Sequence, residues 1–245
     1  MASKWTTVET EDGPMHAYLA EPDGGGPYPG IVVLQEAFGI NSYMRSVCDR
    51  LADVGYVALA PELFHRKGTH VELPYDGDMQ RVLEQMAALT DDGLEDDIDA
   101  SVAALRAHGE VDPRRLAAVG FCLGGYAAMI AGLTTAIAAV VAFYPGLVVR
   151  KRPNLALSPI LDRLPKLRAA TLVNFGGADQ GIPPEDVEAV RQALGHSGAQ
   201  HRIEVWPGAQ HGFHTHDRAS YDPKTAEAAW HASLQWLDRM VRSNA

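Results

Sequence analysis

The sequence predicts an α/β fold with a mostly parallel central sheet, and three patterns support this prediction. Continuous apolar runs, typical of strands buried on both faces, recur along the chain, as at residues 30–35 and 136–143. Segments with apolar residues at helical spacing lie between such runs. Residues 120–125 read Gly-Phe-Cys-Leu-Gly-Gly and join a short apolar strand to a helix of small residues. Alternating strands and helices form sheets with helices on both faces.

The N-terminal half is expected to form a hairpin and the first strand and helix units. The turn-forming Glu11-Asp12-Gly13-Pro14 divides loosely alternating residues into two antiparallel strands. Helical spacing after Ser42 places Cys48 in the core, and Gly55 suits the end of that helix. The aperiodic residues 62–78 predict a loop that could cover a site. The expected elements are strands within 4–20, a strand at 30–35, a helix at 42–55, a strand at 56–60 and two helices within 79–107.

The C-terminal half continues the alternation of strands and helices. Val111-Asp112-Pro113 predicts a turn before the next strand, and the prolines and basic residues of 147–167 predict a loop. Pro183 or Pro184 suits the first turn of a helix. The expected elements are strands at 116–119, 136–143, 171–175 and 202–206, a helix at 126–132, a helix after Pro184 and a last helix at about 225–242.

Bulk composition limits the class of protein. The 245 residues, 47% of them hydrophobic, are enough for a large core, and we expect a single domain spanning residues 1–245. A net charge of −10 without a basic run disfavours nucleic acid as a partner. Two cysteines provide no disulfide framework, and no apolar run approaches the ~18 residues of a spanning helix. We therefore expect a cytoplasmic protein, a monomer or homodimer, that binds neither membranes nor nucleic acid.

Cys122 stands at the centre of the glycine-flanked turn. Glycines two positions before and after a residue keep side chains out of a strained strand-to-helix turn, which is the nucleophile-elbow pattern with cysteine replacing serine. The N-terminus of the following helix would favour a thiolate at Cys122. The alternative is a cysteine buried in a glycine-rich core strand, since free cysteines are among the most buried residues.

Two further residues follow the elbow in an informative order. Asp179 comes after the next-but-one strand and His211 after the strand that follows, which is the order of nucleophile, acid and histidine in α/β-hydrolases. Imidazole takes the nucleophile's proton, and a carboxylate on its other nitrogen fixes the tautomer. Taken singly, His211 could be a turn residue and Asp179 a helix cap. His214 and His216 only weakly suggest a metal pair, so we expect no metal.

Glu36 ends the first apolar strand of the parallel sheet. Open α/β sheets place their ligands at the carboxyl ends of strands, so this carboxylate is a candidate site residue. A solvated loop carboxylate is the alternative.

These residues resemble those of the dienelactone hydrolase family over essentially the whole chain. The resemblance lies in the N-terminal hairpin and in the motifs Leu34 to Asn41, Gly120 to Gly125, Gly176 to Asp179 and Gln210 to Phe213. It implies an α/β-hydrolase fold, Cys122 as nucleophile, His211 as base, Asp179 as its orienting acid and Glu36 as a second carboxylate near the thiol. That carboxylate would keep the resting cysteine protonated.

The resemblance also implies the reaction and its supporting residues. Sulfur attack on an ester or lactone would form an acyl-enzyme that water resolves, without a cofactor. Backbone N–H groups of Leu123 and Ala37 would bind the oxyanion. Well-characterised members hold a serine directly after the histidine and an arginine four residues beyond it, where Gly212 and Thr215 stand here. Candidate substrate-binding residues are Phe38, Arg81, Tyr144 and Phe213, with Arg218 as another source of charge.

Three functions fit these patterns. A cysteine-dependent hydrolase of carboxylic esters or lactones is the leading hypothesis. A catalytically silent binding module on the same fold is the second, and the intact Cys, Asp and His set argues against it. A thiol enzyme that transfers acyl groups or cleaves peptides is the third. The substitutions at Gly212 and Thr215 predict that neutral esters are accepted at least as well as anionic ones.

Overall fold

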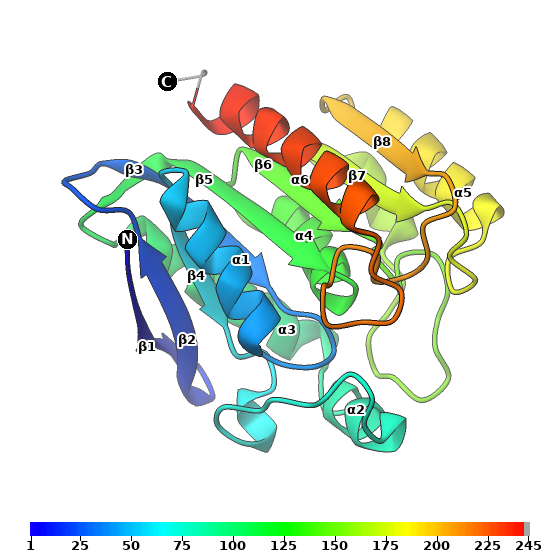
Figure 1. Ribbon diagram of the computed structural model, residues 1–245, viewed down its shortest axis with the longest axis horizontal. Helices are drawn as coiled ribbons and strands as arrows, with labels where there is room; N and C mark the ends of the chain where they lie inside the picture. Colours follow the sequence, from blue (N-terminus) through cyan, green and yellow to red (C-terminus); the bar gives the residue numbers. More distant parts are fainter. Residues whose placement is uncertain (243–245) are drawn as a thin grey trace.

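The computed structural model describes residues 1–242, in which helices flank an eight-stranded sheet of order β1-β2-β4-β3-β5-β6-β7-β8 (Figure 1). The predicted hairpin is present as antiparallel β1 (Ala2–Thr10) and β2 (Gly13–Glu21), and β2 also runs antiparallel to β4. All neighbours from β4 to β8 are parallel. These strands are β3 (Tyr28–Leu34), β4 (Val57–Pro61), β5 (Val111–Phe121), β6 (Ala139–Phe143), β7 (Ala170–Gly176) and β8 (His201–Trp206).

Helices cover both faces of the sheet, as predicted. One face carries α1 (Ser42–Asp53) and α6 (Pro223–Leu237), and the other carries α3 (Asp91–Arg106), α4 (Leu123–Thr134) and α5 (Pro184–Gly195) (Figure 1). The short α2 (Met79–Met86) lies beyond both layers, at the lower edge of the view. The sheet between these layers is the core, which is why β3, β4 and β6 consist of buried residues almost throughout.

Local sequence signals set the ends of the first helix. The side chain of Asn41 accepts a hydrogen bond from the backbone N–H of Met44 (3.1 Å) and caps α1. Gly55 adopts φ of +86°, the left-handed conformation that stops a helix. Between these ends Cys48 is fully buried, which confirms its predicted core position.

The strand order reverses direction at β3 and β5. The chain leaves β3 toward β4 on one side and later returns to β5 on the other side of β3. Such a reversal is a topological switch point, where open α/β sheets bind ligands beyond the carboxyl ends of their strands. Glu36 follows β3 and Cys122 follows β5, so the topology places both residues at this switch point.

The bounds of several elements differ from the sequence prediction: β6 begins at Ala139 rather than at residue 136, α4 is longer than predicted, and the predicted loop 147–167 contains a 3-10 helix, Leu161–Lys166. Two further differences are larger. The strand entering the elbow begins at Val111 rather than at residue 116, because Val111 already pairs with Tyr28. The residues of the predicted turn form an irregularity in the strand, where the pairing register shifts before Leu116 pairs with Gly30. The last helix ends at Leu237 and continues as a π-helical turn, Asp238–Arg242. Within residues 1–242, no helix combines the length and apolar character needed to span a membrane.

Candidate active site

The turn between β5 and α4 is strained around Cys122. Cys122 has φ of 55° and ψ of −112°, a conformation that residues with a side chain rarely adopt. A Cβ on Gly120 would lie 1.9 Å from the carbonyl oxygen of Gly124, and one on Gly124 would lie 2.0 Å from the carbonyl oxygen of Leu34. Both glycines are therefore required by close backbone contacts, as the elbow pattern predicts.

The elbow leaves the sulfur at a helix N-terminus. The backbone N–H of Cys122 donates to the carbonyl of Phe143 on β6 (3.0 Å), which fixes the residue from behind. Leu123 is the first residue of α4, so its N–H has no acceptor within the helix. Cys122 is partly exposed, whereas Cys48 is buried, and burial raises the pKa of the Cys48 thiol. Cys122 is thus the accessible thiol.

The acid and the histidine lie in the loops after β7 and β8, as predicted. The Oδ2 atom of Asp179 is 2.7 Å from Nδ1 of His211. The other carboxylate oxygen accepts the backbone N–H of Gly181 (2.8 Å), which fixes the orientation of Asp179. Since Nδ1 faces Asp179, Nε2 is the ring nitrogen left for Cys122.

The charge state of His211 follows from these neighbours. Burial lowers its pKa, but the Cys122 sulfur and hydrogen bonding with Asp179 and Cys122 outweigh burial and raise the pKa of His211 to about 10. The surroundings of His211 therefore favour its protonated form. A neighbouring imidazolium favours the thiolate form of a cysteine.

Glu36 is fully buried and its side chain is held by three groups. Its Oε2 atom accepts hydrogen bonds from the hydroxyls of Tyr75 (2.9 Å) and Thr215 (3.2 Å). Its Oε1 atom pairs with the guanidinium of Arg218 (3.3 Å). Within residues 1–242, the side-chain hydrogen bonds of Glu36 connect it to these three groups.

Arg218 is a site residue that the sequence left among the alternatives. Burial lowers the pKa of Arg218, but the charges of Glu36 and Cys122 outweigh it, and the pKa is raised. Its guanidinium passes Gly212 so closely that a Cβ there would lie 2.6 Å away. Gly212 also has φ of +76°. Gly212, directly after the histidine, therefore leaves space for the side chain of Arg218. In the sequence, this glycine is the clue that an arginine from further along the chain could enter the site.

The candidate substrate-binding residues occupy different surroundings. Phe38 is buried, and the guanidinium carbon of Arg218 lies over its ring, 5.5 Å from the ring centroid. Tyr144 meets His211 edge to face at 5.0 Å and Phe213 at 5.3 Å. Arg81 is exposed on α2, and within the described part of the chain no hydrogen bond or ion pair joins its side chain to these residues. Phe38, Tyr144 and Phe213 surround the site, and Arg218 rather than Arg81 supplies its cation.

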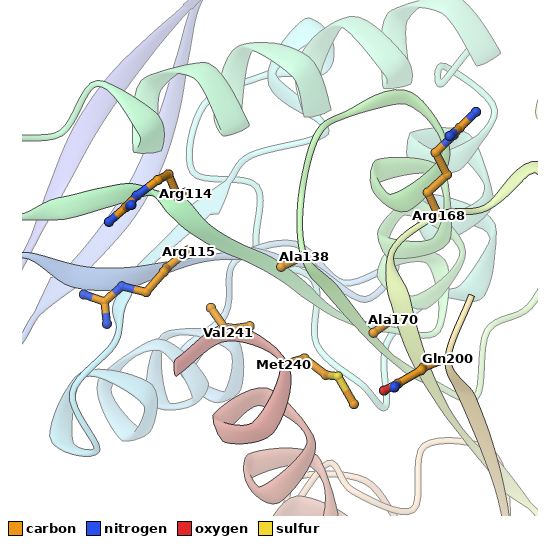
Figure 2. Close-up of a pocket in the computed structure, with 8 residues that line it drawn as sticks. All are labelled: Arg114, Arg115, Ala138, Arg168, Ala170, Gln200, Met240 and Val241. Atoms are coloured by element: carbon orange, nitrogen blue, oxygen red, sulfur yellow. The ribbon is translucent and has the colours of Figure 1, made fainter. Parts of the chain in front are cut away.

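A hollow lies at the opposite end of the sheet, apart from these residues. Its volume is about 390 Å³, and Figure 2 shows Ala138, Ala170 and Val241 around it, with arginines at its edges. Two of those arginines, Arg114 and Arg115, already share the carboxylate of Asp112. Ala138 and Ala170 lie at the N-terminal ends of β6 and β7, whereas Cys122 follows the carboxyl end of β5. Across residues 1–242, no three His, Cys, Asp or Glu side chains gather as a metal-binding group.

His214 supports the site from within the core and predicts how stability depends on pH. It is buried beside Tyr43, and burial lowers the pKa of His214 to about 3. The unfolded chain binds a proton at this residue below pH ~6.5, whereas the folded chain does so only near pH 3. Stability should therefore fall on acidification below pH ~6.5, by up to about 1.4 kcal/mol per pH unit from this group. Urea unfolding of His214→Gln should show a shallower dependence of stability on pH than unfolding of the wild type.

Comparison with known proteins agrees with this arrangement. The model of the dienelactone hydrolase family matches residues 15–241. A Methylorubrum extorquens protein named "Putative carboxymethylenebutenolidase" is 37% identical over 231 residues, covering 94% of this chain and 78% of that protein. A Bradyrhizobium protein named "Probable 2-oxo-3-(5-oxofuran-2-ylidene)propanoate lactonase" is 32% identical, covering 97% of this chain and 94% of that protein.

A solved structure extends the match to three dimensions. The crystal structure titled "Putative Dienelactone Hydrolase" from Klebsiella pneumoniae superposes with a TM-score of 0.87 at 34% identity, covering 96% of this chain and 98% of that one. The parallel sheet with its antiparallel hairpin is thus an α/β-hydrolase fold. On the family match and these relatives, the chain belongs to the dienelactone hydrolase family.

Proposed function

We propose that the chain hydrolyses carboxylic esters or lactones through an acyl-enzyme on Cys122. The observation that carries this proposal is the alignment of Asp179, His211 and Cys122, in which the carboxylate lies 2.7 Å from one imidazole nitrogen and leaves the other for the thiol at the elbow. A histidine whose pKa is raised to about 10 holds the proton that a leaving alkoxide requires.

The reaction follows from the placement of these groups. The Cys122 thiolate attacks the carbonyl carbon, and the resulting oxyanion is bound by the backbone N–H groups of Leu123 and Ala37. The tetrahedral adduct expels the alkoxide, which takes the proton from His211, and a thioester remains on Cys122. His211, now neutral, accepts a proton from water as the water attacks the thioester. The carboxylic acid leaves with Cys122 again a thiolate and His211 again an imidazolium, while Asp179 holds the Nδ1 proton throughout.

A panel of activated aryl esters, lactones and esters bearing a free carboxylate tests this function. We expect turnover of at least one class, with an initial burst of alcohol equal to the enzyme concentration if hydrolysis of the thioester is the slower step. A binding module would retain ligands without turnover. Acyl transfer would appear as products formed with added amines or alcohols in preference to hydrolysis.

The ion pair between Arg218 and Glu36 predicts whether the enzyme prefers neutral or anionic substrates. The guanidinium of Arg218 already neutralises the buried carboxylate of Glu36, so an anionic substrate must compete for it. A free arginine and carboxylate would contribute about 1.5–3 kcal/mol, or about ten- to a hundredfold in kcat/KM. We therefore expect neutral esters to be hydrolysed at least as efficiently as matched esters bearing a carboxylate.

The comparison is repeated in Arg218→Gln, with the exposed Arg81→Gln as the matched control. A strong preference of the wild type for the anionic ester that disappears in Arg218→Gln would contradict the prediction and identify Arg218 as the anion receptor.

A further inference from the structure

We propose that Tyr75 is a positioning residue that acts through Glu36. With Thr215, its hydroxyl holds the Glu36 carboxylate in its pairing with Arg218. The catalytic consequence rests on the proposed function, whereas the effect on the thiol does not.

The hydrogen bonds of Tyr75 have a fixed direction. Its hydroxyl accepts from the side-chain amide of Asn41 (2.9 Å) and lies 2.9 Å from Oε2 of Glu36. An amide nitrogen can only donate, so the single phenolic proton of Tyr75 is directed to Glu36. Burial and the charge of Glu36 raise the pKa of Tyr75, so that it stays a neutral donor. Tyr75 therefore ties Glu36 to the residue that caps α1.

The loop of residues 62–78 places Tyr75 in this position. The backbone of this loop contacts the residues that follow β3. The N–H of Leu73 donates to the carbonyl of Phe38 (3.0 Å), and a β-bridge joins Gly39 to Glu72. The Tyr75 ring also packs on the ring of Phe38 at 4.5 Å. The loop thus covers the segment that includes Glu36 and the proposed oxyanion donor Ala37.

Thr215 supplies the second donor, to the same carboxylate oxygen of Glu36 that accepts from Tyr75. Its hydroxyl lies 3.2 Å from Glu36 and 3.2 Å from the hydroxyl of Tyr144, and both Thr215 and Tyr144 are fully buried. Tyr144 can donate to Thr215 while Thr215 donates to Glu36. Thr215, which stands where well-characterised family members hold arginine, therefore holds Glu36 through its hydroxyl.

Releasing one donor should alter the thiol. Glu36 and Cys122 follow adjacent strands whose residues pair up to Leu34 and Gly120, and Arg218 interacts electrostatically with both side chains. A carboxylate that loses the hydroxyl of Tyr75 is less firmly held on Arg218 and can turn toward the sulfur. A negative charge beside a thiolate disfavours its formation.

Alkylation of Cys122 by iodoacetamide measures this effect without a substrate. The rate is followed by mass spectrometry of the Cys122 peptide at neutral pH, with Cys48 as the buried internal reference. We expect Tyr75→Phe and Thr215→Val to slow alkylation about tenfold, and Thr215→Ser to retain the wild-type rate. Tyr28→Phe is the matched control, because the Tyr28 hydroxyl bonds the carbonyl of Asp23 at an exposed position.

A double-mutant cycle tests whether Tyr75 acts through Glu36. In the Glu36→Gln background, which carries no negative charge, Tyr75→Phe should have no further effect on the alkylation rate. An unchanged or faster rate in Tyr75→Phe alone, or the same tenfold loss in the Glu36→Gln background, would overturn the proposal. Wild-type protein that is alkylated as expected but hydrolyses no ester would refute the proposed function and leave this inference standing.

Discussion

Replacing Cys122 with alanine should abolish ester hydrolysis, lowering kcat by about four orders of magnitude or more, because the acyl-enzyme can no longer form. The fold should persist. The Cys122 side chain is partly exposed, and the contacts that hold the turn are backbone contacts, including the N–H donated to Phe143. Steady-state kinetics of the purified variant, with circular dichroism and thermal melting as the folding control, check this prediction.

Combining Cys122→Ala with a second substitution tests whether Cys122, His211 and Asp179 act as one catalytic unit or independently. His211→Ala and Asp179→Ala should also lose most activity, yet the double variant Cys122→Ala/His211→Ala should be little worse than Cys122→Ala alone, since members of a triad act as a unit. Wild-type rates in Cys122→Ala would mean that the nucleophile lies elsewhere.

Gly124→Ala should be among the most damaging single-methyl substitutions at this site. The new Cβ would lie 2.0 Å from the carbonyl oxygen of Leu34 and 2.6 Å from that of Gln35, so α4 and the end of β3 would have to separate. Overpacking of this kind costs about 3 kcal/mol or more when backbone atoms cannot move away. The displacement also shifts Cys122 relative to Glu36, so we expect activity to fall at least about a hundredfold even in the folded fraction.

Thermal and urea unfolding measure the loss of stability. Gly195→Ala is the matched control, because nothing lies within 4 Å of a Cβ at that position, at the end of α5. If Gly124→Ala unfolds at the same urea concentration as Gly195→Ala, the packing of the elbow against β3 is not as described.

The sequence predicted those parts of the fold that local patterns determine. Apolar runs marked β3, β4, β6 and β7, and the spacing after Ser42 placed Cys48 correctly in the core. The start of β5 was missed because Asp112-Pro113 has turn composition, whereas the pairing of Val111 with Tyr28 extends the strand past it. That pairing joins residues far apart in the chain and leaves no local signal.

The same distinction applies to the candidate site. Cys122, Asp179 and His211 each follow a strand of the parallel sheet, so strand order and motif were enough to bring them together. Tyr75 and Arg218 lie in loops without periodicity, and their contacts with Glu36 depend on how those loops fold back. Gly212 was noted as a departure from the family pattern, but only its backbone angle and its closeness to Arg218 explain the departure.

The central claim is that Cys122 carries the acyl group of the substrate. Rapid quenching of the enzyme with an activated aryl ester, followed by proteolysis and mass spectrometry, tests it directly, and His211→Ala can be included to slow loss of the thioester. The account predicts an acyl adduct on the peptide containing Cys122, removable by hydroxylamine and absent from Cys122→Ala. An adduct mapped to another residue, or substrate turnover that persists in Cys122→Ala with no adduct on any cysteine, would contradict it.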